Sequence, residues 1–182
     1  AYFDNGTLTF RYDDCKDKFE DVYGAAYGIG YNAGWHAGWH SFASSITKVV
    51  FAKSFEDYRP SSCLEWFANC NNLTEIQGMK EYLNTENVTD MGKMFSHCTN
   101  LATIDLSGFN TANVRDMAGM FQGCISLTSL DLSSFDTHNV QVMFSMFSSS
   151  SSLNSNLTTI YVGDNWTTKN VTESEGMFYS CN

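Results

Sequence analysis

The six cysteines are the residues of this chain with the strongest intrinsic reactivity. In an exported chain they would usually suggest disulfides, which need Cα atoms within about 7 Å of each other. Cys63 and Cys70 are seven positions apart on one expected helix, which separates them by about 10 Å. Cys98 and Cys124 lie on consecutive expected helices, and the axes of packed helices lie about 8–10 Å apart. The CxxC-like spacing of a zinc site is absent. We therefore expect free thiols that pack as small hydrophobic side chains at Cys63, Cys70, Cys98, Cys124 and Cys181, and leave Cys15 unassigned.

Two histidines and two tryptophans alternate in a glycine-rich stretch, at positions 35, 36, 39 and 40. On a helix, the His36 and His40 spacing would suit a metal, but Gly38 disfavours a helix and no carboxylate partner is placed. We favour an aromatic loop packed on the N-terminal region, with no bound metal. The weaker alternative is an exposed aromatic patch, Trp35 and Trp39, that stacks on sugar rings.

Asp105 and Asp131 occupy equivalent positions of two similar expected strands, which would place them about 5 Å apart. Because adjacent like charges cost free energy, these carboxylates either accept hydrogen bonds from turn N–H groups and solvent or share a cation. We favour the first, since two carboxylates are too few for a calcium cage. With their neighbours they predict a binding face on exposed strand positions: Thr103, Asp105, Ser107, Ser129, Asp131, Ser133, Thr159 and Tyr161.

No pattern of a known catalytic centre is present. The chain has no GxSxG, HExxH or P-loop sequence, so we expect neither an enzyme nor a cofactor. Lys and Arg number 10 against 20 Asp and Glu, a net charge of −10, which argues against nucleic acid and anionic membranes as partners. The low charged fraction of 16% favours a secreted or cell-surface protein, and no apolar run is long enough for membrane insertion.

The candidate face depends on a sequence repeat with a period of 26 residues. Residues 87–112 are followed directly by a variant of themselves at 113–138, and Val88, Val114 and Val140 mark the same register. Within each unit, apolar residues at intervals of three, four and seven predict a short helix, for example over residues 90–98. An LxxLxL segment then predicts a short strand. Neither element is stable alone, so the units must stack.

The same pattern extends in both directions. Units are expected at about 59–86, 87–112, 113–138, 139–169 and, in part, 170–182. The first unit is two residues longer than the period, and the fourth carries an insertion after a serine run at 148–152. This predicts an α/β fold, a right-handed leucine-rich-repeat-like solenoid with a short strand and a short helix per repeat.

Residues 1–58 lack the repeat and are expected to form an N-terminal β-rich cap. The Asn5-Gly6 dipeptide predicts a turn into a strand that starts at Thr7, and residues 46–51 predict a second strand. We therefore divide the chain into a β-cap at 1–58 and a repeat domain at 59–182.

The repeat NVTDMGKMFSHCTNLATIDLSGFNTA resembles that of BspA-like bacterial surface proteins, which carry leucine-rich repeats of 26 residues. The pattern NVxxMxxMFxxCxxLxxLDLSxFxT is matched almost throughout residues 87–138. The resemblance implies export, surface display and, in some members, adhesion or binding to host proteins.

Together these observations predict a non-enzymatic module, secreted or on the cell surface, with any signal peptide removed. Its expected partner is a protein or glycan of a host, a neighbouring cell or the matrix, bound through the open sheet face. The alternative function is a passive structural spacer or coat component of the bacterial surface.

Overall fold

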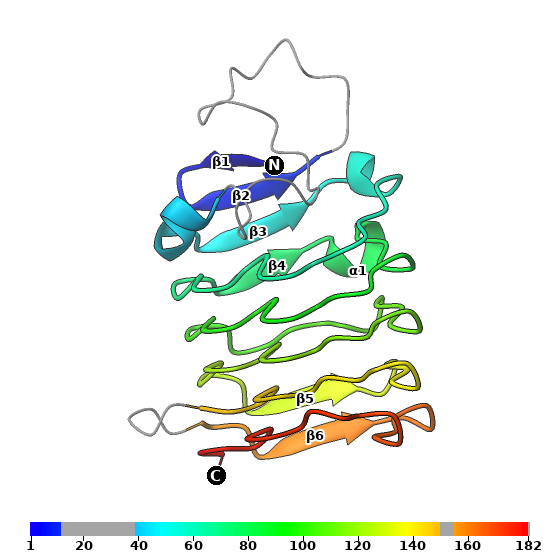
Figure 1. Cartoon of the computed structure of the whole chain (residues 1–182). Helices are drawn as coiled ribbons and strands as arrows, with labels where there is room; N and C mark the ends of the chain where they lie inside the picture. The colour runs from blue at the N-terminus through cyan, green and yellow to red at the C-terminus, as the bar shows by residue number, and fades with distance from the viewer. Residues whose placement is uncertain (12–38, 150–154, 182) are drawn as a thin grey trace.

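The computed structural model describes residues 1–11, 39–149 and 155–181. A four-stranded sheet at the N-terminal end is formed in the order β1 (Tyr2–Asp4), β2 (Thr7–Phe10), β3 (Lys48–Phe51) and β4 (Glu75–Gln77). Strands β1 and β2 are antiparallel, and β2, β3 and β4 are parallel (Figure 1). The turn between β1 and β2 has positive φ at Asn5 (42°) and Gly6 (81°), as the Asn-Gly dipeptide predicted.

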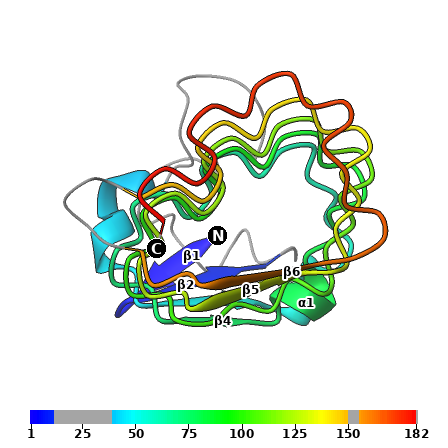
Figure 2. The same cartoon turned by 90° about the horizontal axis from the view of Figure 1, so that it is seen from below.

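A second, two-stranded parallel sheet is formed by β5 (Ser129–Leu132) and β6 (Thr159–Val162). The helices of the described residues are short: the α-helix α1 (Met79–Tyr82) and the 3₁₀ segments η2 (His40–Ser45) and η3 (Lys53–Phe55). All six strands lie on one side of the molecule, and the turns of successive units run along the opposite side (Figure 2).

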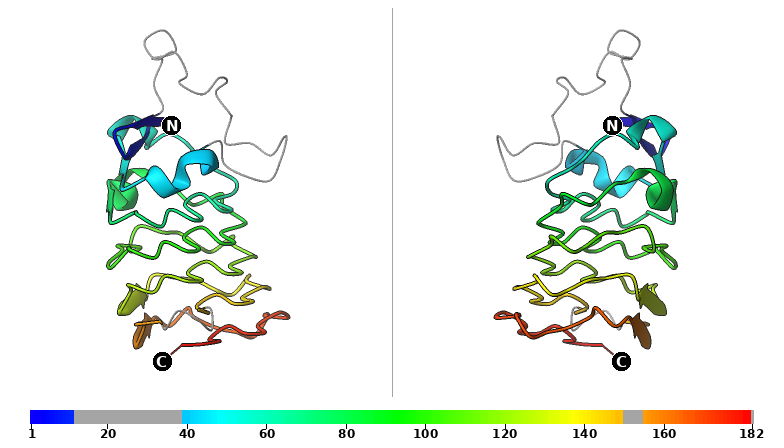
Figure 3. Two further views of the ribbon diagram at one scale, coloured as in Figure 1. Left: turned by 90° about the vertical axis from the view of Figure 1, so that its left-hand side faces the viewer. Right: turned by 90° about the vertical axis from the view of Figure 1, so that its right-hand side faces the viewer.

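Successive units lie one above another (Figure 3). Isolated parallel bridges join them at one residue per unit, in the series Ser62, Asp90, Asp116, Val142 and Glu173. After each bridge residue, alternate N–H groups of one unit donate to carbonyl groups of the following unit. Examples are Phe95 N to Met120 O at 3.0 Å and Phe121 N to Met146 O at 2.9 Å. The 26-residue register read from the sequence is thus the register in which neighbouring units bond.

The expected helix over residues 90–98 and its counterparts are not formed. Lys93 and His97 have φ of 51° and 59°, and Gly119 and Gly123 have 59° and 71° at the same places in the next unit. A left-handed residue ends a helical turn, so each segment is a series of tight turns. Apolar residues three and four apart still reach the core, which is why their spacing resembled that of a helix.

The predicted fold class, a leucine-rich-repeat-like solenoid with a strand and a helix in every unit, is therefore wrong. The described residues form a small mixed α/β structure with separate sheets of four and two strands and one four-residue α-helix. Residues 101–107, the expected strand segment of the second unit, lie between the sheets and belong to neither.

The core is a continuous cluster that extends through all the units and into β2 and β3. Four buried phenylalanine rings of this cluster, one per unit, form a stacked column that the exposed Phe178 extends at its end, with centroids 5.4–6.0 Å apart: Phe67, Phe95, Phe121, Phe147 and Phe178. Strand β4 of the first unit completes the sheet begun by β1, β2 and β3. The division of the chain at residues 58 and 59 remains a prediction.

Candidate functional site

The predicted face is exposed to solvent along its whole length. Ser129 pairs with Thr159 and Asp131 with Tyr161 in the parallel register of β5 and β6. The Tyr161 side chain is 58% exposed. In the preceding unit, Thr103 and Asp105 are also exposed, although their backbone is not part of a sheet. The eight residues singled out from the sequence thus share one side of the molecule: Thr103, Asp105, Ser107, Ser129, Asp131, Ser133, Thr159 and Tyr161.

The two aspartates of this face each close a local turn. Asp105 Oδ1 accepts hydrogen bonds from Ser107 N at 3.0 Å and Ser107 Oγ at 2.6 Å. Asp131 Oδ1 accepts the same pair from Ser133, at 2.9 and 2.5 Å. These bonds hold the pKa of both carboxyl groups below the ordinary value, and the charge of Asp105 partly opposes this effect at Asp131. The arrangement agrees with the turn-bonded interpretation of the sequence.

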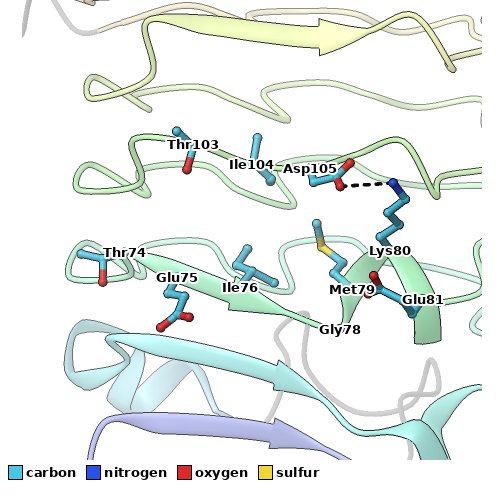
Figure 4. Close-up of a pocket in the computed structure, with 10 residues that line it drawn as sticks. All are labelled: Thr74, Glu75, Ile76, Gly78, Met79, Lys80, Glu81, Thr103, Ile104 and Asp105. Atoms are coloured by element: carbon cyan, nitrogen blue, oxygen red, sulfur yellow. Dashed lines mark ion pairs between the residues drawn. The ribbon is translucent and has the colours of Figure 1, made fainter.

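A hollow with a volume of about 420 Å³ lies at the lower-numbered end of this face (Figure 4). The partly buried Ile76 and Ile104 and the buried Met79 supply its apolar lining. The polar lining comes from Thr74, Glu75, Lys80, Glu81, Thr103 and Asp105. An ion pair between Lys80 Nζ and Asp105 Oδ2, 3.6 Å long, crosses from α1 to the second unit.

The hollow is a gap between β4 and residues 103–105. Both segments line it with a partly buried isoleucine, Ile76 or Ile104, and with an exposed carboxylate, Glu75 or Asp105. Within the described residues, no backbone hydrogen bond joins Thr103, Ile104 or Asp105 to β4 or to β5. The units do meet on either side of this gap. Thr99 Oγ1 donates to Asn71 O at 3.1 Å, and a Cβ atom on Gly108 would lie 2.4 Å from Lys80 O. We call the gap the inter-unit slot.

Sequence reasoning placed Thr103 and Asp105 on a candidate face but missed the slot. The available signal was the length of the first unit, two residues beyond the period. In the structure this unit contains α1, directly after a left-handed Gly78 (φ 69°) at the end of β4. The 26-residue unit that follows has no counterpart of α1.

The weak aromatic patch is not supported where the structure describes it. Trp39 is only 7% exposed, and its indole Nε1 donates to Trp66 O at 2.5 Å. Its ring packs edge-on against Phe10, with centroids 5.1 Å apart. A buried ring offers no stacking surface for a sugar, so the assignment of Trp39 to a glycan site is wrong. Trp35 and His36 lie outside the described residues, and His40 Nε2 lies 2.8 Å from Glu65 O.

The cysteines of the described residues are free thiols, as expected: Cys63, Cys70, Cys98 and Cys124 are buried and Cys181 is partly buried. Desolvation raises the pKa of Cys70 and of Cys124 to about 12. Cys98 Sγ donates to Phe67 O at 3.2 Å and Cys124 Sγ to Phe95 O at 3.0 Å, which adds a link between units to their packing role. Cys15 lies outside the described residues.

No cluster of three or more histidine, cysteine or acidic side chains is placed to hold a metal ion among residues 1–11, 39–149 and 155–181. Over the same ranges, no helix has the length and apolarity required to cross a membrane.

Residues 61–182 match the model of the family described as "Mycoplasma protein of unknown function, DUF285". The match covers well over half of the chain, which therefore belongs to this family. No curated protein and no solved structure matches the chain.

Proposed function

We propose that this chain is a non-enzymatic binding module, secreted or displayed on a cell surface. In this proposal its partner is a protein or glycan of a host, a neighbouring cell or the extracellular matrix. The binding site is the exposed face that runs from Thr103 to Tyr161. The resemblance of residues 87–138 to BspA-like surface proteins is part of the proposal.

The observation that supports a binding role is that the carboxylates of this exposed face are held in fixed positions. Its carboxylates are fixed by serine residues of the same turn, so their positions are preorganised before any partner arrives. Preorganised polar groups lose little conformational entropy on binding. Tyr161, in register with Asp131, adds an exposed ring of the kind enriched in protein interfaces.

The test is a screen of the purified chain against extracellular-matrix proteins and a glycan array. We expect a saturable hit that is lost in the triple variant Asp105→Asn, Asp131→Asn and Tyr161→Ser. The matched control is Glu173→Gln, Glu175→Gln and Phe144→Ser, which removes two exposed carboxylates and an exposed ring outside the strands. A hit that survives the first variant would refute this face as the site. Self-association without any foreign ligand would support the alternative of a spacer or coat component.

A further inference from the structure

Residues 101–107 have the side-chain pattern of a strand but no strand partner. Their sequence, LATIDLS, matches the LTSLDLS segment that contains β5 position for position in residue type. Exposed and inward-facing side chains alternate from Thr103 to Leu106, as they do along β5. The difference is that Ile104 is only partly buried, whereas its counterpart Leu130 is 1% exposed.

The two ends of this segment are already joined to the third unit. Ser126 Oγ donates to Thr99 O at 2.6 Å, just before the segment begins. Ser134 Oγ donates to Leu106 O at 3.3 Å, where the segment ends. These contacts hold residues 103–105 beside β5 at the period of the repeat. Among the described residues, the backbone hydrogen bonds that would complete a strand pair between them are missing.

The inter-unit slot leaves residues 103–105 free to approach β5. It lies on their β4 side, so a movement away from β4 breaks no backbone hydrogen bond between the two segments (Figure 4). The ion pair between Lys80 Nζ and Asp105 Oδ2 joins two exposed side chains and is therefore weak. A pair with β5 would also bring Ile104 beside the buried Leu130.

Like charge is the physical reason that the pair is absent. At the period of the repeat Asp105 would lie beside Asp131, and like charges on neighbouring strands destabilise their pairing. On its other side, β5 does pair with β6, and there Asp131 lies beside the uncharged Tyr161. The ladder thus forms on the side of β5 where the neighbour is neutral and is missing on the side where the neighbour is charged.

We propose that residues 103–105 join β5 as a strand when the charge of Asp105 or Asp131 is neutralised, which makes the exposed face continuous from Thr103 to Tyr161. The balance is close, because exposed backbone groups exchange water for ladder bonds at a small net gain. This inference rests on the proposed binding function for its use. A partner that places a cation at these two carboxylates would favour the paired state and bind the completed face.

The experiment measures amide hydrogen exchange of the full chain at pH 7 by NMR, without any ligand. In the natural chain we expect fast exchange at residues 103–106 and protection of the amides that pair β6 with β5. In Asp105→Asn, and equally in Asp131→Asn, every second amide of residues 103–106 should exchange about fivefold more slowly relative to β6. The double variant should add little, since either change alone removes the same repulsion.

The matched control is Asp164→Asn, which removes a carboxylate from an exposed turn after β6 and should leave exchange at residues 103–106 unchanged. Circular dichroism establishes that all variants are folded. Protection of residues 103–106 in the natural chain would show that they are already paired. Slower exchange in Asp105→Asn alone would assign the effect to the ion pair with Lys80, and no change in either variant would exclude repulsion. Each of these results would overturn the proposal.

Failure of this transition and failure of the proposed function have different signatures, because the exchange experiment needs no partner. A matrix-protein or glycan hit that depends on Tyr161, with unchanged exchange in both aspartate variants, would overturn the transition and retain the binding module. Slower exchange in both variants of a chain that is silent in both screens would retain the transition and count against the face as a binding site.

Discussion

Phe95 and Phe121 stack with their ring centroids 5.8 Å apart and their planes within 8° of parallel. Phe95 also stacks on Phe67 at 5.5 Å, so it has a ring neighbour in the unit above and in the unit below. The column therefore couples the units through burial and ring contact as well as through their backbone hydrogen bonds.

We expect Phe95→Ala to lower the free energy of unfolding by about 3–5 kcal/mol, because it removes a fully buried ring and leaves a cavity between units. Phe178→Ala should cost about 1 kcal/mol, since Phe178 is 55% exposed and stacks on one neighbour, Phe147. Urea unfolding of both variants followed by circular dichroism measures the difference. Equal costs would show that the column does not control stability.

The left-handed positions of the turns give a second prediction. Gly119 (φ 59°) and Ser145 (φ 54°) occupy the same place in consecutive units. Gly119→Ser should destabilise by about 1 kcal/mol, because a side chain is strained at positive φ. Ser145→Gly removes that strain but adds backbone entropy to the unfolded chain, so we expect a change of less than about 0.5 kcal/mol. Thermal melts of the two variants test this, and a stabilising Gly119→Ser would contradict the assigned backbone.

Much of the packing could be predicted from the sequence. The recurrence of Val88, Val114 and Val140 at 26-residue intervals predicted the register of the bridges between these units, and all three valines are fully buried. The strand alternation around Ser129 to Leu132 was also correct, because a period of two has few competing explanations.

The helices could not be predicted correctly, because a spacing of three and four residues is compatible with both a helix and consecutive tight turns. The distinguishing signal was Gly119 and Gly123, four positions apart in one unit, but Lys93 and His97 hide it in the unit before. The slot was missed for a different reason. It exists because residues 103–105 pair with neither neighbouring strand, although their sequence matches that of β5 position for position.

The thiols give a third prediction, on reactivity. Cys70 and Cys124 combine burial with a pKa of about 12, so they contain almost no thiolate at pH 8. In a Cys15→Ser background we expect a thiol reagent to modify only the partly buried Cys181, slowly, and the other four cysteines only after unfolding. Mass spectrometry counts the modified residues. Rapid modification of Cys98 in the folded chain would contradict its burial between units.

Two aspartates should respond to pH in opposite directions. Desolvation raises the pKa of Asp90, and the neighbouring charges of Asp116 and Glu65 add to this, while the hydrogen bond from Gly92 N opposes it. Its ionised form therefore costs stability at neutral pH, and this cost disappears as the pH falls through the raised pKa towards the unfolded value of about 3.9. Hydrogen bonds from Ser133 lower the pKa of Asp131 below its unfolded value. Its contribution to stability is therefore fully present above the unfolded value and is lost as the pH falls through the lowered pKa.

Replacing each aspartate by asparagine separates these effects. Asp90→Asn keeps an oxygen to accept from Gly92 N and removes the partly buried charge, so the variant should be more stable than the natural chain at pH 7. Asp131→Asn should be less stable at pH 7, since the hydrogen bonds to Ser133 lose their charged acceptor. In urea titrations at a series of pH values, the Asp90→Asn difference should shrink as the pH falls towards 4, and the Asp131→Asn difference should shrink only as the pH falls below about 4. If Asp90→Asn were less stable than the natural chain at pH 7, Asp90 would not be the desolvated group that its position between units implies.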